Sequence, residues 1–129
     1  MTDKPAPRVT DMNQLYFEGC AQGELRLRRC GSCAALFRFA HEWCPKCWSL
    51  ELGWIRACGI GKVTHFSVVY QPPSDAFETP YVLALIELDE GVRMMSNVKC
   101  EPGAVRIGLP VRVVFEPRGQ VSLPMFVPR

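Results

Sequence analysis

The chain has almost no net charge. Its 129 residues carry 15 lysines and arginines against 13 aspartates and glutamates, which leaves a formal charge of +2. Proteins that bind nucleic acid mainly through phosphate contacts are usually far more basic, so a nucleic-acid partner is not expected. Hydrophobic residues make up 48% of the sequence, which is enough for the core of one domain with a small appendage.

The sequence also lacks a long hydrophobic run. No stretch approaches the roughly 20 apolar residues that a membrane-spanning helix needs. The first residues, Met1–Arg8, are polar and contain proline, and no apolar stretch follows them. We therefore expect no membrane partner and no secretory signal, and we predict a cytoplasmic protein.

The cysteines are concentrated in two pairs. Cys30 and Cys33 form one C-x2-C motif, and Cys44 and Cys47 form a second one after ten intervening residues. The two-residue spacing lets both sulfurs of a pair face one ion, and two pairs close a tetrahedron around zinc. We predict a structural zinc, because four thiolates leave no open position for a water molecule.

The three remaining cysteines are Cys20, Cys58 and Cys100. We predict that they are ordinary reduced thiols, because an odd total of seven suits a reducing compartment better than a disulfide framework.

Histidine is scarce, with only His41 and His65. His41 precedes Cys44 closely, but four cysteines already complete the metal site, so we predict a surface role for it. No serine, aspartate or cysteine stands at a recognisable catalytic spacing from His65. We predict no catalytic residue in this chain, and we do not expect it to be an enzyme on its own.

Residues 1–23 predict a tail and a short helix. Thr10 or Asp11 can cap the helix, and glycines at 19 and 23 can end it. Leu15, Tyr16 and Phe17 give it an apolar surface. That surface can pack on its own domain or dock on a partner chain, and we predict docking through these three residues.

The rest of the chain predicts β structure. Residues 24–52 form the zinc ribbon, with strands expected at 24–29 and 36–39, and residues 48–55 lead into a second unit. In residues 53–129 the patterns predict strands at 63–70, 81–88, 92–98 and 111–115, with a helical turn near 101–105. Residues 121–127 are expected to be extended, but Pro124 makes them an edge strand or a tail. The 81–88 segment is nearly all apolar, which predicts burial on both faces.

The predicted fold is therefore mostly β: a short N-terminal helix, a four-cysteine zinc ribbon, and a five-stranded OB-type barrel with an extended C-terminal tail. Strand number alone does not distinguish an OB barrel from an SH3-like barrel.

These pieces occur in an order that resembles one known family. The resemblance covers residues 11–117 and is carried by Tyr16-Phe17-Glu18-Gly19, the four cysteines, Gly59-Ile60-Gly61-Lys62-Val63, Pro80-Tyr81-Val82, Leu88-Asp89-Glu90-Gly91-Val92 and Ile107-Gly108-Leu109-Pro110-Val111. The family is that of acyl-CoA-associated OB-fold proteins with an N-terminal helix and a rubredoxin-like zinc ribbon.

The resemblance implies a function as a non-catalytic accessory subunit of a thiolase-fold acyl-CoA enzyme, such as a thiolase, an acyltransferase or an aldolase. It further implies that the helix and ribbon dock on the partner chain, and that the barrel helps to enclose the coenzyme A arm.

Two segments depart from the family pattern. Many members have glycine directly after the second and fourth ribbon cysteines, where this chain has Ala34 and Trp48. The ligand sulfurs are intact, so the metal site is still predicted. Many members also have a Pro-Pro-Arg run where this chain has Phe39-Ala40-His41, which puts a family contact of that loop in question.

Coenzyme A carries several phosphate groups, so a protein that holds it needs cations or free backbone N–H groups beside apolar surface. The candidates are Arg38 between Phe37 and Phe39, and Lys62 after the bend at Gly59-Ile60-Gly61. The glycines of that bend would let a ligand approach the backbone closely.

Two other functions stay open. OB barrels and zinc ribbons both occur in single-stranded nucleic-acid-binding modules, although near-neutral charge argues against this one. A rubredoxin-like electron carrier would hold iron in the four-thiolate site. Rubredoxin-type knuckles need little bulk beside the sulfurs so that N–H groups can approach, and Trp48 fits that requirement poorly.

Overall fold

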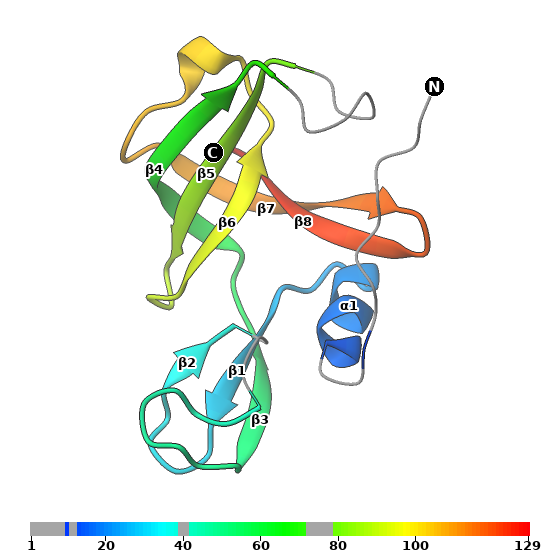
Figure 1. The fold of residues 1–129 in the computed structure, drawn as a ribbon, viewed down its shortest axis with the longest axis vertical. Helices are drawn as coiled ribbons and strands as arrows, with labels where there is room; N and C mark the ends of the chain where they lie inside the picture. Colours follow the sequence, from blue (N-terminus) through cyan, green and yellow to red (C-terminus); the bar gives the residue numbers. More distant parts are fainter. Residues whose placement is uncertain (1–9, 11–12, 39–41, 72–78) are drawn as a thin grey trace.

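The computed structural model describes residues 10, 13–38, 42–71 and 79–129. Within them, a short helix and a three-stranded ribbon lie below a β-barrel (Figure 1). The elements are α1 (Gln14–Ala21), ribbon strands β1 (Arg26–Cys30), β2 (Leu36–Phe37) and β3 (Leu52–Arg56), barrel strands β4 (Ile60–Val69), β5 (Tyr81–Leu88), β6 (Arg93–Val98), β7 (Pro110–Arg118) and β8 (Val121–Pro128), and the 3-10 helix η1 (Pro102–Ala104). In these residues no helix is long and apolar enough to span a membrane.

The ribbon is an antiparallel sheet with the order β2-β1-β3. β3 pairs with β1 along its whole length, from Arg26 opposite Arg56 to Cys30 opposite Leu52. The sequence predicted that residues 48–55 lead into the barrel; β3 at the end of this segment pairs with the ribbon strand β1 before the chain enters β4. Because β2 is only two residues long, β1 gains most of its pairing from β3, and the ribbon sheet continues past the predicted end at residue 52 to Arg56.

The five remaining strands close into a barrel with the order β4-β5-β6-β8-β7, and β7 pairs back onto β4. This confirms the predicted five-stranded OB-type barrel. The expectation that residues 121–127 form an edge strand or a tail was wrong, because β8 pairs with β7 along its whole length and lies between β7 and β6. β6 and β8 run parallel and pair only at Val98 opposite Phe126. The closure between these two strands is therefore short, and their remaining edges diverge.

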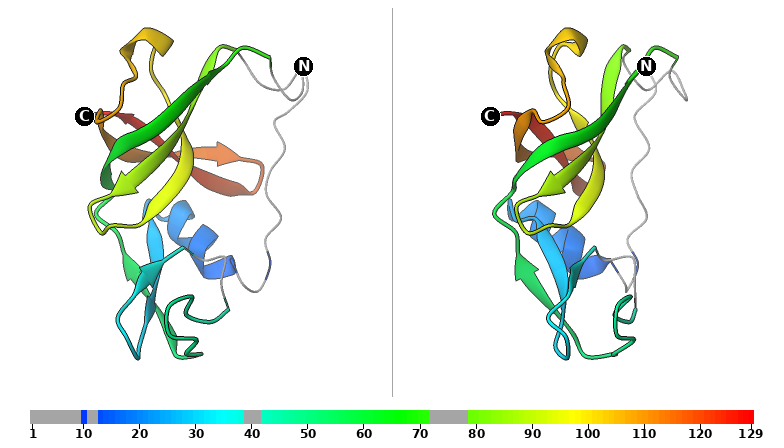
Figure 2. Two further views of the ribbon diagram at one scale, coloured as in Figure 1. Left: turned by 60° about the vertical axis from the view of Figure 1, so that its left-hand side comes forward. Right: turned by 90° about the vertical axis from the view of Figure 1, so that its left-hand side faces the viewer.

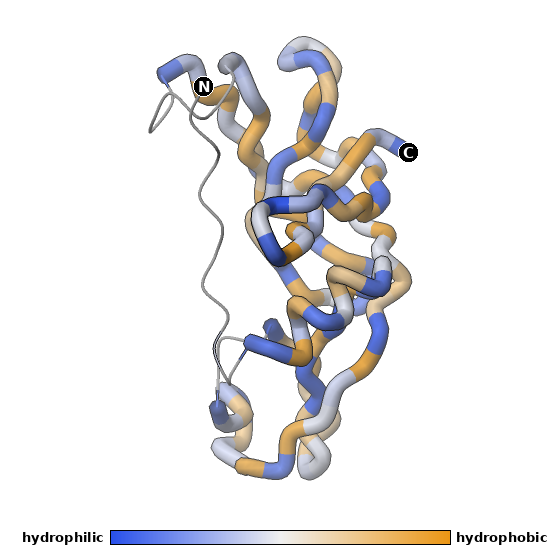
Figure 3. Tube along the Cα trace, turned by 90° about the vertical axis from the view of Figure 1, so that its right-hand side faces the viewer, coloured by the Kyte–Doolittle hydropathy of each residue, from blue (hydrophilic) through white to orange (hydrophobic). Residues whose placement is uncertain are grey.

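Buried and more exposed residues alternate along the barrel strands β5 and β6, and Figure 3 colours the trace by hydropathy. On β5, Val82, Ala84, Ile86 and Leu88 are buried, while the residues between them are half-buried. The prediction that this strand is buried on both faces was thus wrong for its outer face, because no element among the described residues fully covers it.

The helix α1 joins the two units. It lies beside β1 and under the β7–β8 hairpin in both Figure 1 and Figure 2. It begins after Asn13, later than the predicted caps, of which Asp11 falls outside the described residues. Tyr16 and Phe17 pack edge to face at 5.3 Å, and both belong to the same core cluster as the barrel interior. The helix therefore contributes its aromatic face to this chain's own core.

Candidate functional site

The four predicted ligands come together at the end of the ribbon. The sulfur atoms of Cys30, Cys33, Cys44 and Cys47 all lie within 4.8 Å of one another. The Cys30–Cys47 and Cys33–Cys44 sulfur pairs are 3.5 and 3.6 Å apart. In a tetrahedral zinc–thiolate site, bonds of about 2.3 Å place the sulfurs roughly 3.8 Å apart. The donor set therefore fits one tetrahedral metal ion, which would link the two knuckles.

Backbone N–H groups favour the thiolate form of the first cysteine in each knuckle. The N–H groups of Cys33 and Ser32 donate to the Cys30 sulfur and lower its pKa to about 6. Burial tends to raise the pKa of Cys44, but the N–H groups of Cys47 and Lys46 bring it below its ordinary value.

The four neighbouring thiols also shift one another's pKa values. The Ser49 N–H lowers the pKa of Cys47, but the neighbouring thiols of Cys30 and Cys33 outweigh it and raise that pKa to about 12. Four thiolates this close need a cation between them. When bound, a closed four-thiolate zinc stabilises the ribbon and offers no open position for chemistry.

The two residues that stand where many family members have glycine adopt a strained backbone conformation. Ala34 and Trp48 have φ values of 62° and 68°, in the left-handed region that favours glycine. Their N–H groups donate to the carbonyl oxygens of Cys30 and Cys44, which closes each knuckle. The knuckle geometry is thus retained without glycine, at a conformational cost.

Trp48 does not weigh against an iron site. The sequence predicted that the bulk of Trp48 would keep N–H groups away from the sulfurs, yet the Lys46 and Cys47 N–H groups lie 3.4 Å from the Cys44 sulfur. The Trp48 side chain points into solvent, with 74% of its surface exposed. It therefore does not obstruct the sulfurs.

The predicted docking residues have different surroundings. Tyr16 and Phe17 are 2% and 7% exposed within this chain alone, whereas Leu15 is 45% exposed. Burial raises the pKa of Tyr16 to about 12, and the Arg38 guanidinium, which donates to its hydroxyl at 3.1 Å, opposes that rise. Partner docking through these residues stays a prediction, and Leu15 is the one that offers accessible surface.

The predicted coenzyme A residues are not gathered into one site. Phe37 is buried in the small ribbon core with Cys30 and Cys44, and Phe39 lies outside the described residues. Arg38 is half-buried against Tyr16, with its guanidinium carbon 5.6 Å from the ring centroid. Lys62 is exposed on β4 and pairs with Glu87 at 3.7 Å. Their contact with coenzyme A stays a prediction.

The glycines of the bend before Lys62 have a structural reason. A Cβ atom on Gly59 would overlap the Val113 side chain, and one on Gly61 would lie 2.6 Å from the Glu87 carbonyl oxygen. These glycines let neighbouring strands approach each other, so they give no separate support for a ligand at this bend.

The three other thiols differ in burial. Cys20 is buried in the main core, and this raises its pKa to about 11. Burial also raises the pKa values of the more accessible Cys58 and Cys100. None of these shifts would activate a nucleophile at neutral pH, which agrees with the prediction of ordinary thiols.

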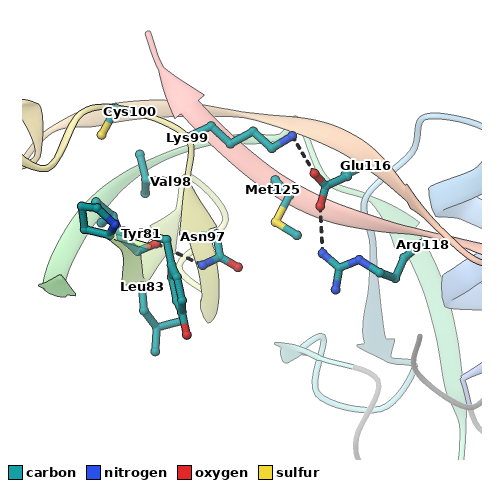
Figure 4. Close-up of a pocket in the computed structure, with 11 residues that line it drawn as sticks. Tyr81, Leu83, Asn97, Val98, Lys99, Cys100, Glu116, Arg118 and Met125 are labelled. Atoms are coloured by element: carbon teal, nitrogen blue, oxygen red, sulfur yellow. Dashed lines mark hydrogen bonds and ion pairs between the residues drawn. The ribbon is translucent and has the colours of Figure 1, made fainter. Parts of the chain in front are cut away.

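A cleft of about 430 Å³, lined by residues of β5, β6, β7 and β8, was not predicted from the sequence. One wall consists of the ends of β5 and β6, with Tyr81, Leu83 and Asn97 (Figure 4). The other carries Lys99, Glu116 and Arg118. The residues of the two walls lie far apart in the sequence and form no motif. The one local signal is that Glu116 and Arg118 are two residues apart on one strand, which places both charges on the same face.

A second space of about 260 Å³ has Tyr16 and Phe17 of α1 in its lining. Asn97 and Met125 line both spaces, so the two are adjacent, and together they are called the groove. The part near α1 is mostly apolar and includes Met94, Leu123 and Phe17, with Arg38 also in its lining. The groove thus has a charged end and an apolar end.

Two family models match the chain in succession. Residues 17–53 match the ChsH2 rubredoxin-like zinc ribbon domain, and residues 54–116 match the ChsH2 C-terminal OB-fold domain. The chain belongs to the ChsH2 family. This confirms the resemblance seen in the sequence and the zinc-ribbon character of the four-cysteine site.

Three relatives illustrate what the chain is similar to. A probable enoyl-CoA hydratase alpha subunit of Thermomonospora curvata is 37% identical over 97% of this chain and 40% of its own length. A DUF35 domain-containing scaffold protein of Methanocaldococcus jannaschii is 44% identical over 67% of this chain and 64% of its own. The benzoylsuccinyl-CoA thiolase subunit BbsA of Geobacter metallireducens is 32% identical over 69% and 60%. The chain thus spans less than two thirds of the length of these relatives.

A solved structure described as an Ltp2-ChsH2(DUF35) aldolase contains a chain with the same fold. The TM-score is 0.85 at 36% identity, and the match covers 95% of this chain and 98% of the other. The helix, ribbon and barrel therefore recur together as one unit in the ChsH2 family.

Proposed function

We propose that the chain is an accessory subunit of a thiolase-fold acyl-CoA enzyme, namely a thiolase, an acyltransferase or an aldolase, and that it helps to enclose the coenzyme A arm. The observation that carries the proposal is the near-complete match to the ChsH2 chain of an Ltp2-ChsH2(DUF35) aldolase. The metal supports this role by holding the ribbon rigid, since all four of its ligands come from the protein.

Exposed apolar side chains support a docking role for the ribbon and α1. Trp43 and Trp48 stack with their rings 6.3 Å apart and nearly parallel, at 4°. Nearby along the chain, Leu50 is 78% exposed, and Leu15 adds accessible apolar surface on α1. Large apolar residues gathered on so small a unit are typical of a protein interface, and here the thiolase-fold chain would cover them.

The test is copurification with a candidate thiolase-fold chain. Leu15→Glu and Trp48→Glu should each weaken the complex about tenfold or more, because each places a charge in a buried interface. Tyr70→Glu is the matched control, since Tyr70 is a 68% exposed aromatic residue at the end of a barrel strand. Point substitutions are used because a deletion of residues 1–22 would also remove the core residues Tyr16 and Phe17. Full copurification of both interface variants would contradict the proposed surface.

A cytoplasmic location remains part of the proposal. It is supported by the seven cysteines, all in the described part of the chain, none of which forms a disulfide, as expected in a reducing compartment.

Electron transfer is a second candidate, favoured by the N–H···S contacts to Cys30 and Cys44, which also suit an iron–thiolate site. The metal content and visible spectrum of the purified protein decide between the two. A red, iron-containing protein would support electron transfer, and a colourless zinc protein would exclude it.

A further inference from the structure

The charged end of the groove contains one carboxylate shared by two cations. Glu116 accepts from Lys99 at 3.0 Å and from Arg118 at 2.8 Å, as Figure 4 shows. The Arg118 side chain is only 11% exposed, although it borders a cleft of about 430 Å³. A cation this enclosed requires an anionic partner, and Glu116 supplies one within the chain.

A similar triad elsewhere on the barrel provides a comparison. Glu87 lies 3.7 Å from Lys62 and 3.6 Å from Arg93, and those two cations are 60% and 58% exposed. That triad is looser, lies in solvent and borders neither part of the groove. The Glu116 triad therefore differs in combining short contacts, low exposure of the arginine and an adjacent cavity.

The two cations and one carboxylate leave a net charge of +1 at this end of the groove. A phosphate monoester, as in free phosphopantetheine, and the pyrophosphate of coenzyme A each carry more charge than a carboxylate and have at least three acceptor oxygens, so either can replace Glu116 as the partner of both cations. The opposite end offers the flexible side chain of Met94 beside Leu123 and Phe17. Methionine adapts its shape to different apolar groups.

We propose that this groove binds a phosphopantetheine arm, with its phosphate at Lys99 and Arg118 and its chain running over Met125 towards Met94. Glu116 acts as a placeholder, since it neutralises the two cations until the phosphate displaces it. The choice of ligand rests on the proposed function. The arm could belong to coenzyme A, which presents a pyrophosphate, or to a carrier protein, which presents a phosphodiester with a single charge.

Glu116→Gln provides a test that misfolding cannot imitate, because it predicts a gain of affinity. Calorimetry on the full chain, and on its complex with the partner, should show phosphopantetheine binding at least severalfold more tightly to Glu116→Gln than to the unmodified chain. Arg118→Met should weaken binding about tenfold, since it removes a charge-assisted contact. Pantetheine, which lacks the phosphate, should respond to neither substitution.

The second triad supplies matched controls. Glu87→Gln and Arg93→Met change the same types of residue outside the groove and should leave the affinity for phosphopantetheine unchanged. Coenzyme A binding about tenfold more tightly than phosphopantetheine would identify coenzyme A as the source of the arm. Equal affinities would show that the arm alone is recognised, as in a carrier protein.

Two results would overturn the inference. One is an affinity for phosphopantetheine that Glu116→Gln fails to raise in both the chain and the complex. The other is tight binding of a thymidine oligonucleotide that Arg118→Met abolishes and salt strongly weakens, which would assign the groove to nucleic acid. Because copurification with the partner is measured separately, the accessory-subunit proposal can stand or fall independently.

Discussion

Replacing Ala34 by glycine should strengthen metal binding. Ala34 has a φ of 62°, and a left-handed conformation costs a residue with a Cβ about 1–2 kcal/mol. Glycine removes that cost but loses about 0.5–1 kcal/mol through the greater entropy of the unfolded chain. Ala34 is exposed, so little packing is lost. The net gain should be about 0.5–1 kcal/mol, or roughly two- to fivefold in affinity.

Competition with a zinc chelator measures this gain directly. Because folding of the ribbon and metal binding are coupled, a strain that exists only in the folded knuckle lowers the apparent zinc affinity. Lys46→Gly is the matched control, since Lys46 is an exposed knuckle residue outside the left-handed region. It should weaken zinc binding through chain entropy alone.

Trp48 should behave differently, although its φ of 68° is similar. Trp48→Gly relieves the same strain but removes the stacking contact with Trp43, which is worth about 0.5–1.5 kcal/mol. The two effects nearly cancel. In a Trp43→Ala background the stack is already lost, so Trp48→Gly should tighten zinc binding about as much as Ala34→Gly does. The reasoning would be refuted if Ala34→Gly weakened zinc binding as Lys46→Gly does.

Three further predictions concern the metal, the helix and the ligand. Cys44→Ser should lose zinc and be cleaved by protease between residues 25 and 50. Cys58→Ser, the control, should keep both zinc and protease resistance. A Cys44→Ser protein with stoichiometric zinc would disprove Cys44 as a metal ligand. Burial raises the pKa of Tyr16 to about 12 from an unfolded value near 10. Its contribution to stability should therefore be complete below pH 10 and be lost as the pH rises through 12, and Tyr16→Phe should remove this loss in alkaline unfolding curves. Equal alkaline sensitivity of the two proteins would show that Tyr16 does not cause it. Replacing Arg38 and Lys62 together by alanine should raise the partner enzyme's KM for acyl-CoA severalfold with a smaller fall in kcat, and an unchanged KM in the assembled complex would exclude both residues from the coenzyme A site.

The metal site and the barrel were predictable because their signals are local. The two-residue spacing of Cys30 and Cys33, and of Cys44 and Cys47, is itself the geometry of a knuckle, and the cluster forms as expected. Alternating side chains likewise mark strands such as β5, whose predicted bounds at 81–88 agree with the structure. Each of these patterns lies within one short segment and does not depend on distant partners.

Other features depend on which segments meet. The pattern at Leu52–Arg56 does not reveal that this strand pairs with β1, and the helix pattern left open whether Tyr16 and Phe17 face a partner or this chain's own core. The Glu116 triad joins Lys99, just after β6, to two residues of β7. Charge pairing and burial arise from contacts between distant segments, so the tertiary structure alone decided where the groove lies and which cations border it.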